Sequence, residues 1–194
     1  MAIDGASELK LTSLAFNDVD HFCDWEQGLG FQIEATQLSA GGGEVRFDHF
    51  AVPGLIVSRF SSKPSMQNLF AIPEGLALLV ICRTKRPVLW CGKHFPSTFL
   101  AVLRSKREHW VVLPGEWDCY EFIISEDLIY ETEIFTPASF AETERLEHAR
   151  LPLVEPVTRN FLQGMDAFFQ YARDGNGSGD NAVHKQHFFS FIID

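Results

Sequence analysis

The stretch VLPGEWDCYEFIISEDL (Val112–Leu128) decides the fold, because a strand passes into a helix within it. Residues 118–124 alternate as a β-strand does, with one face formed by Cys119, Glu121 and Ile123 and the other by Tyr120, Phe122 and Ile124. Ser125 then offers the hydroxyl of a helix N-cap, and two acidic residues follow it in the first turn, where the helix dipole favours negative charge. We therefore expect β-structure before Ser125 and helices after it.

Short strands separated by turns are expected in the part of the chain that precedes this stretch. A short strand (9–16) comes first, followed by a helix from an Asn17 cap to Gly28. Strands then recur about every ten residues between Gly and Pro turns, at 31–39, 44–52, 55–61, 67–72, 76–82, 88–90, 98–103, 109–112 and 116–124. No crossover helices separate them, so the pattern favours an antiparallel barrel or sandwich over a parallel sheet.

The chain after residue 124 has a helical pattern. Thr136 and Pro137 are typical of the N-cap and first residue of a helix that reaches about His148, and a proline-bounded connector follows at Leu151–Pro156. The strongest helix is expected at Val157–Ala172, where four apolar residues form one narrow stripe: Val157, Phe161, Met165 and Phe168. Such a stripe needs a partner surface, which can be the barrel or a second chain.

The last residues lack the signals that end a helix. A Gly-rich hinge at 174–181 leads to a final helix near Ala182, whose end, HFFSFIID, is apolar nearly all round and has no C-cap. We expect the parent protein to continue past Asp194.

The composition is that of a globular protein and disfavours two classes of function. The chain has 194 residues, and its net charge of −10 would repel the phosphate backbone, so DNA binding by these residues alone is not expected. There is no secretory signal and no uncharged apolar run of about 18 residues that could span a membrane. The four cysteines show no CxxC spacing, which favours reduced, buried thiols and a cytoplasmic location.

The residues that could bind a metal or perform catalysis are scattered. A metal-binding cupin needs two close His on one strand, a carboxylate nearby and a further His, whereas His49, His94 and His109 stand singly. His109 and Cys119 could meet on paired strands as a catalytic dyad, although chance juxtaposition explains them well enough. No nucleophile elbow, P-loop or dinucleotide motif is present. We therefore expect no metal, no cofactor and no enzymatic activity.

Aromatic side chains from different strands point to a ligand pocket. Phe47 and His49 share one strand face, and Trp90 and Tyr120 come from other strands of the barrel. Aromatic surfaces with a few polar tips are the usual composition of a small-molecule site, although each residue could equally fill the core. We take the face of Tyr120, with Phe122 and Ile124, as the inward one.

The order of segments resembles the N-terminal sensor domain of AraC-type transcription regulators. The resemblance rests on QLSAGGGEVRFDHFAVPGLIVSRFSS (Gln37–Ser62) and HWVVLPGEWDCYEFIISEDLI (His109–Ile129), and more weakly on LPLVEP (Leu151–Pro156) and the helix after it. It implies a cupin-like barrel that binds a small effector, helices that form a homodimer, and a C-terminal helix-turn-helix domain that binds promoter DNA. No basic helix-turn-helix segment is found here, and none of the family's sugar-binding residues maps cleanly.

We therefore interpret the chain as mainly β with C-terminal helices: a cupin-like effector-sensing barrel at 1–124 and a helical dimerisation segment at 125–194. The resemblance favours a second chain as the partner of the Val157/Phe161/Met165/Phe168 stripe. Two alternatives stay open, namely a free-standing cupin enzyme with an unrecognised site and a dimerisation scaffold whose barrel is filled. A bound metal with activity would indicate the enzyme, and a barrel without a pocket would indicate the scaffold.

Overall fold

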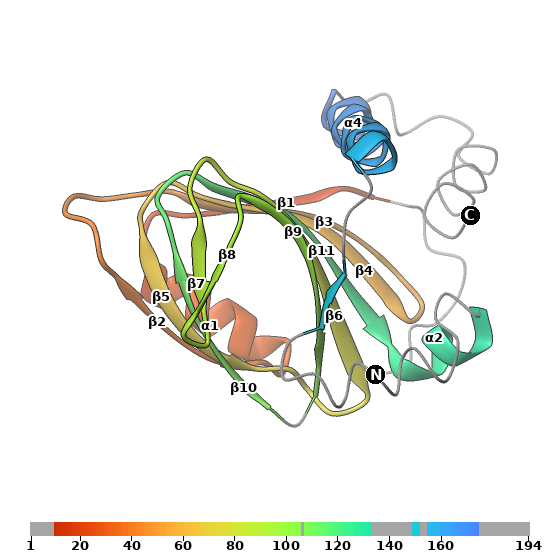
Figure 1. The fold of residues 1–194 in the computed structure, drawn as a ribbon, viewed down its shortest axis with the longest axis horizontal. Coiled ribbons are helices and arrows are strands. Elements are labelled where there is room, and N and C mark those ends of the chain that lie inside the picture. Colours follow the sequence, from red (N-terminus) through yellow and green to blue (C-terminus); the bar gives the residue numbers. More distant parts are fainter. Residues whose placement is uncertain (1–9, 106, 133–148, 152–154, 175–194) are drawn as a thin grey trace.

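The computed structural model describes residues 10–105, 107–132, 149–151 and 155–174 (Figure 1). Within these residues, twelve strands form two antiparallel sheets, one of seven strands in the order β1-β3-β4-β11-β6-β9-β12 and one of five in the order β2-β5-β10-β7-β8. The expected architecture, an antiparallel β-fold followed by a helix, is confirmed. The strands are β1 (Thr12–Phe16), β2 (Gln32–Gln37), β3 (Val45–Val52), β4 (Leu55–Ser62), β5 (Met66–Ala71), β6 (Leu76–Arg83), β7 (Val88–Trp90), β8 (Lys93–Phe95), β9 (Thr98–Arg104), β10 (Glu108–Leu113), β11 (Trp117–Ser125) and β12 (Ala149–Leu151).

Most strand bounds agree with the alternation in the sequence to within two residues, but β8 and β12 were not expected. Each has three residues, which is too short for an alternation to show. β12 belongs to the segment after residue 124, yet it pairs with β9 and extends the seven-stranded sheet. The seven-stranded sheet therefore includes a strand from the part of the chain that was expected to be helical.

The helices begin close to the capping signals. Helix α1 (Val19–Gly28) is capped by Asp18, whose side chain accepts a hydrogen bond from the backbone N of Asp20 at 2.8 Å, and not by Asn17 as expected. Helix α2 (Glu126–Thr132) follows β11 directly, and the Ser125 hydroxyl accepts from the backbone N of Leu128 at 3.2 Å, which confirms the predicted cap.

Helix α4 (Glu155–Arg173) begins two residues before the expected Val157 and takes Pro156 into its first turn, where the missing N–H of proline is tolerated. The predicted helices at 136–148 and from Ala182 lie outside the described residues. Among the described helices, none has the length and apolar character that crossing a membrane requires.

The pairing register stacks the inward side chains of the seven-stranded sheet in layers. Opposing residues place His49, Ser58, Glu121, Val80 and Ala101 in one row across β3, β4, β11, β6 and β9. The adjacent row consists of Phe47, Phe60, Cys119, Cys82 and Phe99. These rows, the five-stranded sheet and α1 enclose the main hydrophobic core.

A second hydrophobic cluster lies on the outer face of the seven-stranded sheet, where α4 packs. Tyr120, Phe122 and Ile124 of β11 belong to it, together with Met165 and Phe169 of α4. Since the main core covers the inner face of this sheet, both of its faces are covered.

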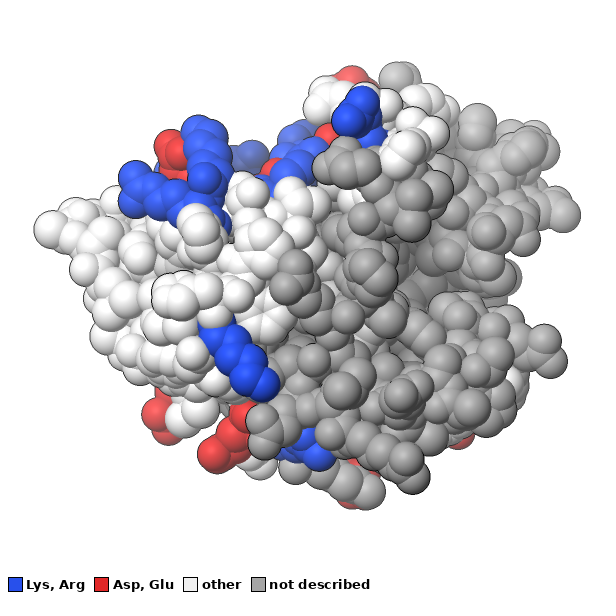
Figure 2. Space-filling model, viewed as in Figure 1, with Lys and Arg blue, Asp and Glu red and all other residues white. Residues whose placement is uncertain are grey.

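Figure 2 shows that Lys and Arg side chains gather along the upper edge of the molecule, the side on which α4 lies in Figure 1.

Candidate ligand-binding cavity

The space between the two sheets contains a cavity of about 60 Å³ that is open to water-sized molecules. Its wall is mostly aromatic and aliphatic and comes from α1, β2, β4, β5, β6, β7, β10 and β11. The polar side chains on this wall are Glu26, Asn68, Trp90, Trp117 and Glu121. Because a site of this composition holds an apolar body while a few polar groups orient it, the cavity is the candidate functional site.

Glu121 enters the cavity from the inner face of β11, the central strand of the large sheet. The protein encloses this side chain, and the surface that it retains faces the cavity. Its carboxyl oxygens accept from the Ser58 hydroxyl at 3.4 Å and from the Cys119 thiol at 3.5 Å. Burial outweighs both interactions and raises the pKa of Glu121 to about 7.

Glu26 enters the same cavity from α1. It lies on the buried face of the helix, three residues after Cys23 and four after Phe22. Burial, with a smaller effect from the charge of Glu121, raises the pKa of Glu26 to about 8. The two carboxyl groups are thus near enough to influence each other, and their pKa values lie near neutrality.

Two further polar groups, on residues that line the cavity, have no hydrogen-bond partner among the described residues. They are the side-chain oxygen Oδ1 of Asn68, on β5, and the indole Nε1 of Trp90, on β7. Asn68 is 6% exposed and Trp90 is 2% exposed. Leaving such a group unsatisfied costs about 1–3 kcal/mol, so both are suited to bind a ligand that completes their hydrogen bonds.

The structure distributes the four expected pocket residues over three environments. Trp90 lines the cavity. Phe47 and His49 face inward as expected but contact Trp25 of α1, with ring centroids 4.7 and 6.0 Å apart, and do not line the cavity. The expectation that Tyr120 faces inward is wrong, because it lies on the opposite face of β11, under α4.

Sequence reasoning missed Glu26, Asn68 and Glu121. Glu121 alternates with Cys119 and Ile123, so a carboxylate on an otherwise apolar strand face was visible, but that face was taken as the outer one. Glu26 continues the stripe of Phe22 and Cys23 at helical spacing. A carboxylate within an apolar stripe was therefore the available signal in both cases.

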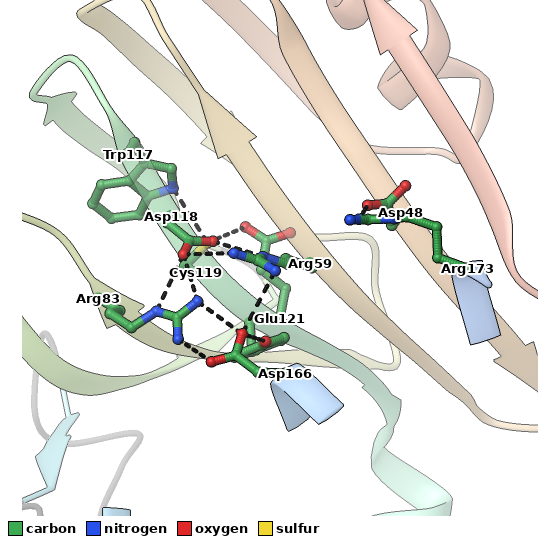
Figure 3. Close-up of polar contacts among 10 residues, drawn as sticks. Asp48, Arg59, Arg83, Trp117, Asp118, Cys119, Glu121, Asp166 and Arg173 are labelled. Atoms are coloured by element: carbon green, nitrogen blue, oxygen red, sulfur yellow. Dashed lines mark hydrogen bonds and ion pairs between the residues drawn. The ribbon is translucent and has the colours of Figure 1, made fainter. Parts of the chain in front are cut away.

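The outward face of β11 is attached to α4 by a polar cluster, shown in Figure 3. Asp118 accepts from Arg59 at 3.0 Å and from Arg83 at 2.6 Å. Asp166 of α4 accepts from Arg83 at 3.0 Å and from the Tyr120 hydroxyl at 2.6 Å. We call these five residues the α4 clamp.

The charges of the α4 clamp stabilise one another. Burial would raise the pKa of Asp166, but the hydrogen bonds from Arg83 and Tyr120 outweigh it and the pKa is lowered. The guanidinium carbons of Arg59 and Arg83 lie 5.9 and 5.6 Å from the centre of the Tyr120 ring, within the range of cation–π attraction. A separate ion pair, between Arg173 and the buried Asp48, holds the end of α4 to β3.

The apolar stripe of α4 packs on the chain's own sheet, and the contact with a second chain that the resemblance implies stays a prediction. Met165 is fully buried there, Phe161 lies 6.0 Å from Phe122 between ring centroids, and Phe168 lies 4.8 Å from Phe50. The side chain of Val157 is outside the described part of the chain. The homodimer itself stays a prediction.

The metal and dyad hypotheses have the following outcome. In the described part of the chain, no three His, Cys, Asp or Glu side chains converge as metal ligands. His109 and Cys119 are not on paired strands, because β10 and β11 belong to different sheets. The Cys119 thiol accepts from the Trp117 indole at 3.2 Å, and burial raises its pKa well above the ordinary value, so it stays protonated.

No family model and no curated protein matches the sequence. Among solved structures, the chain is similar to cupin-like β-barrel proteins. A variant of Streptomyces Pac13 with uridine shares 10% identity over 62% of this chain and 88% of that one, at a TM-score of 0.33. A structure of Pac13 described as a β-barrel nucleoside dehydratase has the same values. A variant of oxalate decarboxylase from Bacillus subtilis shares 13% identity over 57% of this chain and 34% of that one, at a TM-score of 0.30. Likeness at this level carries no argument about the site.

Proposed function

We propose that the chain is a ligand-sensing barrel that binds a small effector in the cavity, as the sensor part of an AraC-like transcription regulator, and that it is not an enzyme. The observation that carries the proposal is the aromatic cavity, whose wall includes two carboxyl groups and two residues with unpartnered polar atoms. Unsatisfied groups in the wall of a preformed cavity favour binding of a complementary molecule. The regulatory role is supported by the resemblance in segment order, which also suggests a homodimer and a separate DNA-binding domain.

A route from the cavity to α4 supports a sensing role. Within β11, Glu121 faces the cavity, while its neighbour Tyr120 donates to Asp166 of α4. A ligand that binds Glu121 acts on the same backbone that holds the α4 clamp. It can shift the position of α4 only if it binds the two arrangements of the helix with different affinities.

The proposal is tested with a thermal-shift screen of small metabolites on three proteins. Val80 faces Glu121 across the strand pair and lines the cavity, so Val80→Phe should fill the cavity. Ile81→Phe is the matched control, because the adjacent side chain packs on the outer face of the same strand. A cavity ligand at a hundred times its Kd should stabilise the wild type and Ile81→Phe by about 2.7 kcal/mol, and leave Val80→Phe unchanged. Ligands that stabilise Val80→Phe equally would place binding elsewhere.

An acid–base enzyme is the second candidate, because two carboxyl groups with pKa values of about 7 and about 8 lie in one enclosed cavity. Such values suit a general acid and base near neutral pH. Mass spectrometry of each stabilising ligand after long incubation separates the two functions. A sensor returns the ligand unchanged, whereas turnover that Glu121→Gln abolishes would establish an enzyme.

A further inference from the structure

The cavity wall carries acidic side chains but no basic one among its described residues. Of the described residues that line it, none is Lys, Arg or His, and two are Glu. No cation of the described chain lies near enough to lower the pKa of Glu26 or Glu121. Two carboxyl groups enclosed together are unfavourable when ionised, because they repel each other and lose hydration without a compensating charge.

The unpartnered atoms define where a ligand's polar groups would lie. The Oδ1 atom of Asn68 is a hydrogen-bond acceptor, and both carboxylates are acceptors when ionised. These three groups therefore need hydrogen-bond donors on the ligand. The Nε1 atom of Trp90 is a hydrogen-bond donor and needs one acceptor on the ligand. Asn68 is more than nine-tenths buried, so its oxygen cannot turn to bulk water for a partner.

The remaining wall is suited to an apolar body next to a positive charge. Phe22 and Phe60 stack with ring centroids 5.4 Å apart, and Phe70 and Trp117 also line the cavity. Aromatic faces attract a nearby cation, and the attraction is stronger where water is excluded. Aromatic walls and carboxylates thus favour the same kind of ligand.

We propose that the ligand is a small organic cation, a primary amine or amidine on a compact apolar body, whose N–H groups bind Glu26, Glu121 and Asn68. This rests on the proposed function, since it names the class of effector for the same cavity. The cation supplies the charge that the enclosed carboxyl groups lack, and its binding drives protons from them into solution. An acceptor on the ligand, where there is one, meets Trp90.

Three probes with the same ring and different charge test this inference: benzylamine, benzyl alcohol and benzoate. Isothermal titration calorimetry at pH 7 in two buffers of different ionisation enthalpy measures both affinity and proton release. Benzylamine should bind and release protons, benzyl alcohol should bind at least tenfold more weakly without proton release, and benzoate should not saturate.

Variants locate the effect at the cavity. Glu121→Gln should weaken benzylamine at least tenfold and leave benzyl alcohol within a factor of two. Glu34→Gln, on the exposed side of β2, removes the same charge outside the cavity and should change neither probe. Circular dichroism of each variant confirms that it is folded.

The outcomes separate this inference from the proposed function. Equal binding of benzylamine and benzyl alcohol, or stronger binding of benzoate, overturns the cationic ligand and leaves the ligand cavity in place. Binding of none of the three overturns both. Benzylamine binding that Glu34→Gln weakens as much as Glu121→Gln does would show that net charge, and not the cavity, attracts the amine.

Discussion

Replacing Glu121 by Gln should stabilise the folded chain at pH 8 and change its stability little at pH 5. The pKa of this carboxyl is about 7 in the folded chain, against an ordinary value of 4.5. Between these values the folded state binds more protons than the unfolded state, so the free energy of unfolding falls as pH rises through this window. Below this pH range the carboxyl is protonated in both the folded and the unfolded state, so it does not lower the free energy of unfolding.

The size of the effect follows from the two pKa values. A tenfold change in proton affinity corresponds to about 1.4 kcal/mol, so pKa values of about 7 and 4.5 imply a loss of about 3 kcal/mol above pH 7. Gln carries no charge and keeps one acceptor oxygen, which can serve either Ser58 or Cys119 but not both. For a chain of this length, about 3 kcal/mol corresponds to a rise in Tm of roughly 6–12 °C at pH 8.

Denaturant unfolding at pH 5 and pH 8 measures the difference directly. The other ionisable groups on the inward faces around Glu121 are Glu26, Cys82, Cys119, His49 and His109, and the variant retains all of them. The exposed Glu34→Gln is the control, and its stability should follow the wild type at both pH values within about 0.5 kcal/mol. If Glu121→Gln is less stable than the wild type at pH 8, the carboxylate has a stabilising partner and the reasoning fails.

Four further measurements test the clamp, the helix packing and the partners. Tyr120→Phe should lower stability by about 1–2 kcal/mol by removing the donor to Asp166, and speed amide exchange in α4, while benzylamine binding persists. Met165→Ala should cost about 2–5 kcal/mol in denaturant unfolding, whereas Gln163→Ala on the exposed face of α4 should be nearly neutral. Light scattering should give the mass of a homodimer, and a monomer at every concentration would contradict it. Elemental analysis should find no stoichiometric metal, since its presence would favour the enzyme.

The strands were predictable because their alternation is local and glycine or proline separates them. Gly54 illustrates this: its φ of +77° ends β3 in a tight turn, and a Cβ there would lie 3.0 Å from the Ser125 hydroxyl. β8 and β12 were not predicted because three residues do not establish a period. In addition, β12 pairs with a strand almost fifty residues away in the sequence, with Ala149 opposite Val102. Local patterns do not report such distant pairing.

The candidate site was predictable only in part, because alternation shows that a strand has two faces but not which one is inside. Both faces of β11 are buried, one in the barrel and one under α4, so hydrophobicity could not orient the strand. The more apolar face, with Tyr120, was taken as inward, whereas the structure turns Glu121 inward. Trp90, expected in the wall only because it is an aromatic residue on another strand, does line the cavity.

The same two-sided burial explains why β11 is the element on which sensing would depend. Successive side chains of a strand point to opposite faces, so the residue that meets the cavity and the residue that holds α4 are covalent neighbours. The flanking strands repeat the arrangement: β4 carries Ser58 inward and Arg59 outward, and β6 carries Cys82 inward and Arg83 outward. Glu121 thus lies one residue from Tyr120 on β11 and opposite Ser58, the neighbour of Arg59 on β4. On β6 the residue opposite Glu121 is Val80, and Arg83 lies three residues further along that strand. An effector that moves these strands must change the contacts of α4, whereas one that fills the cavity without moving them leaves the helix where it is.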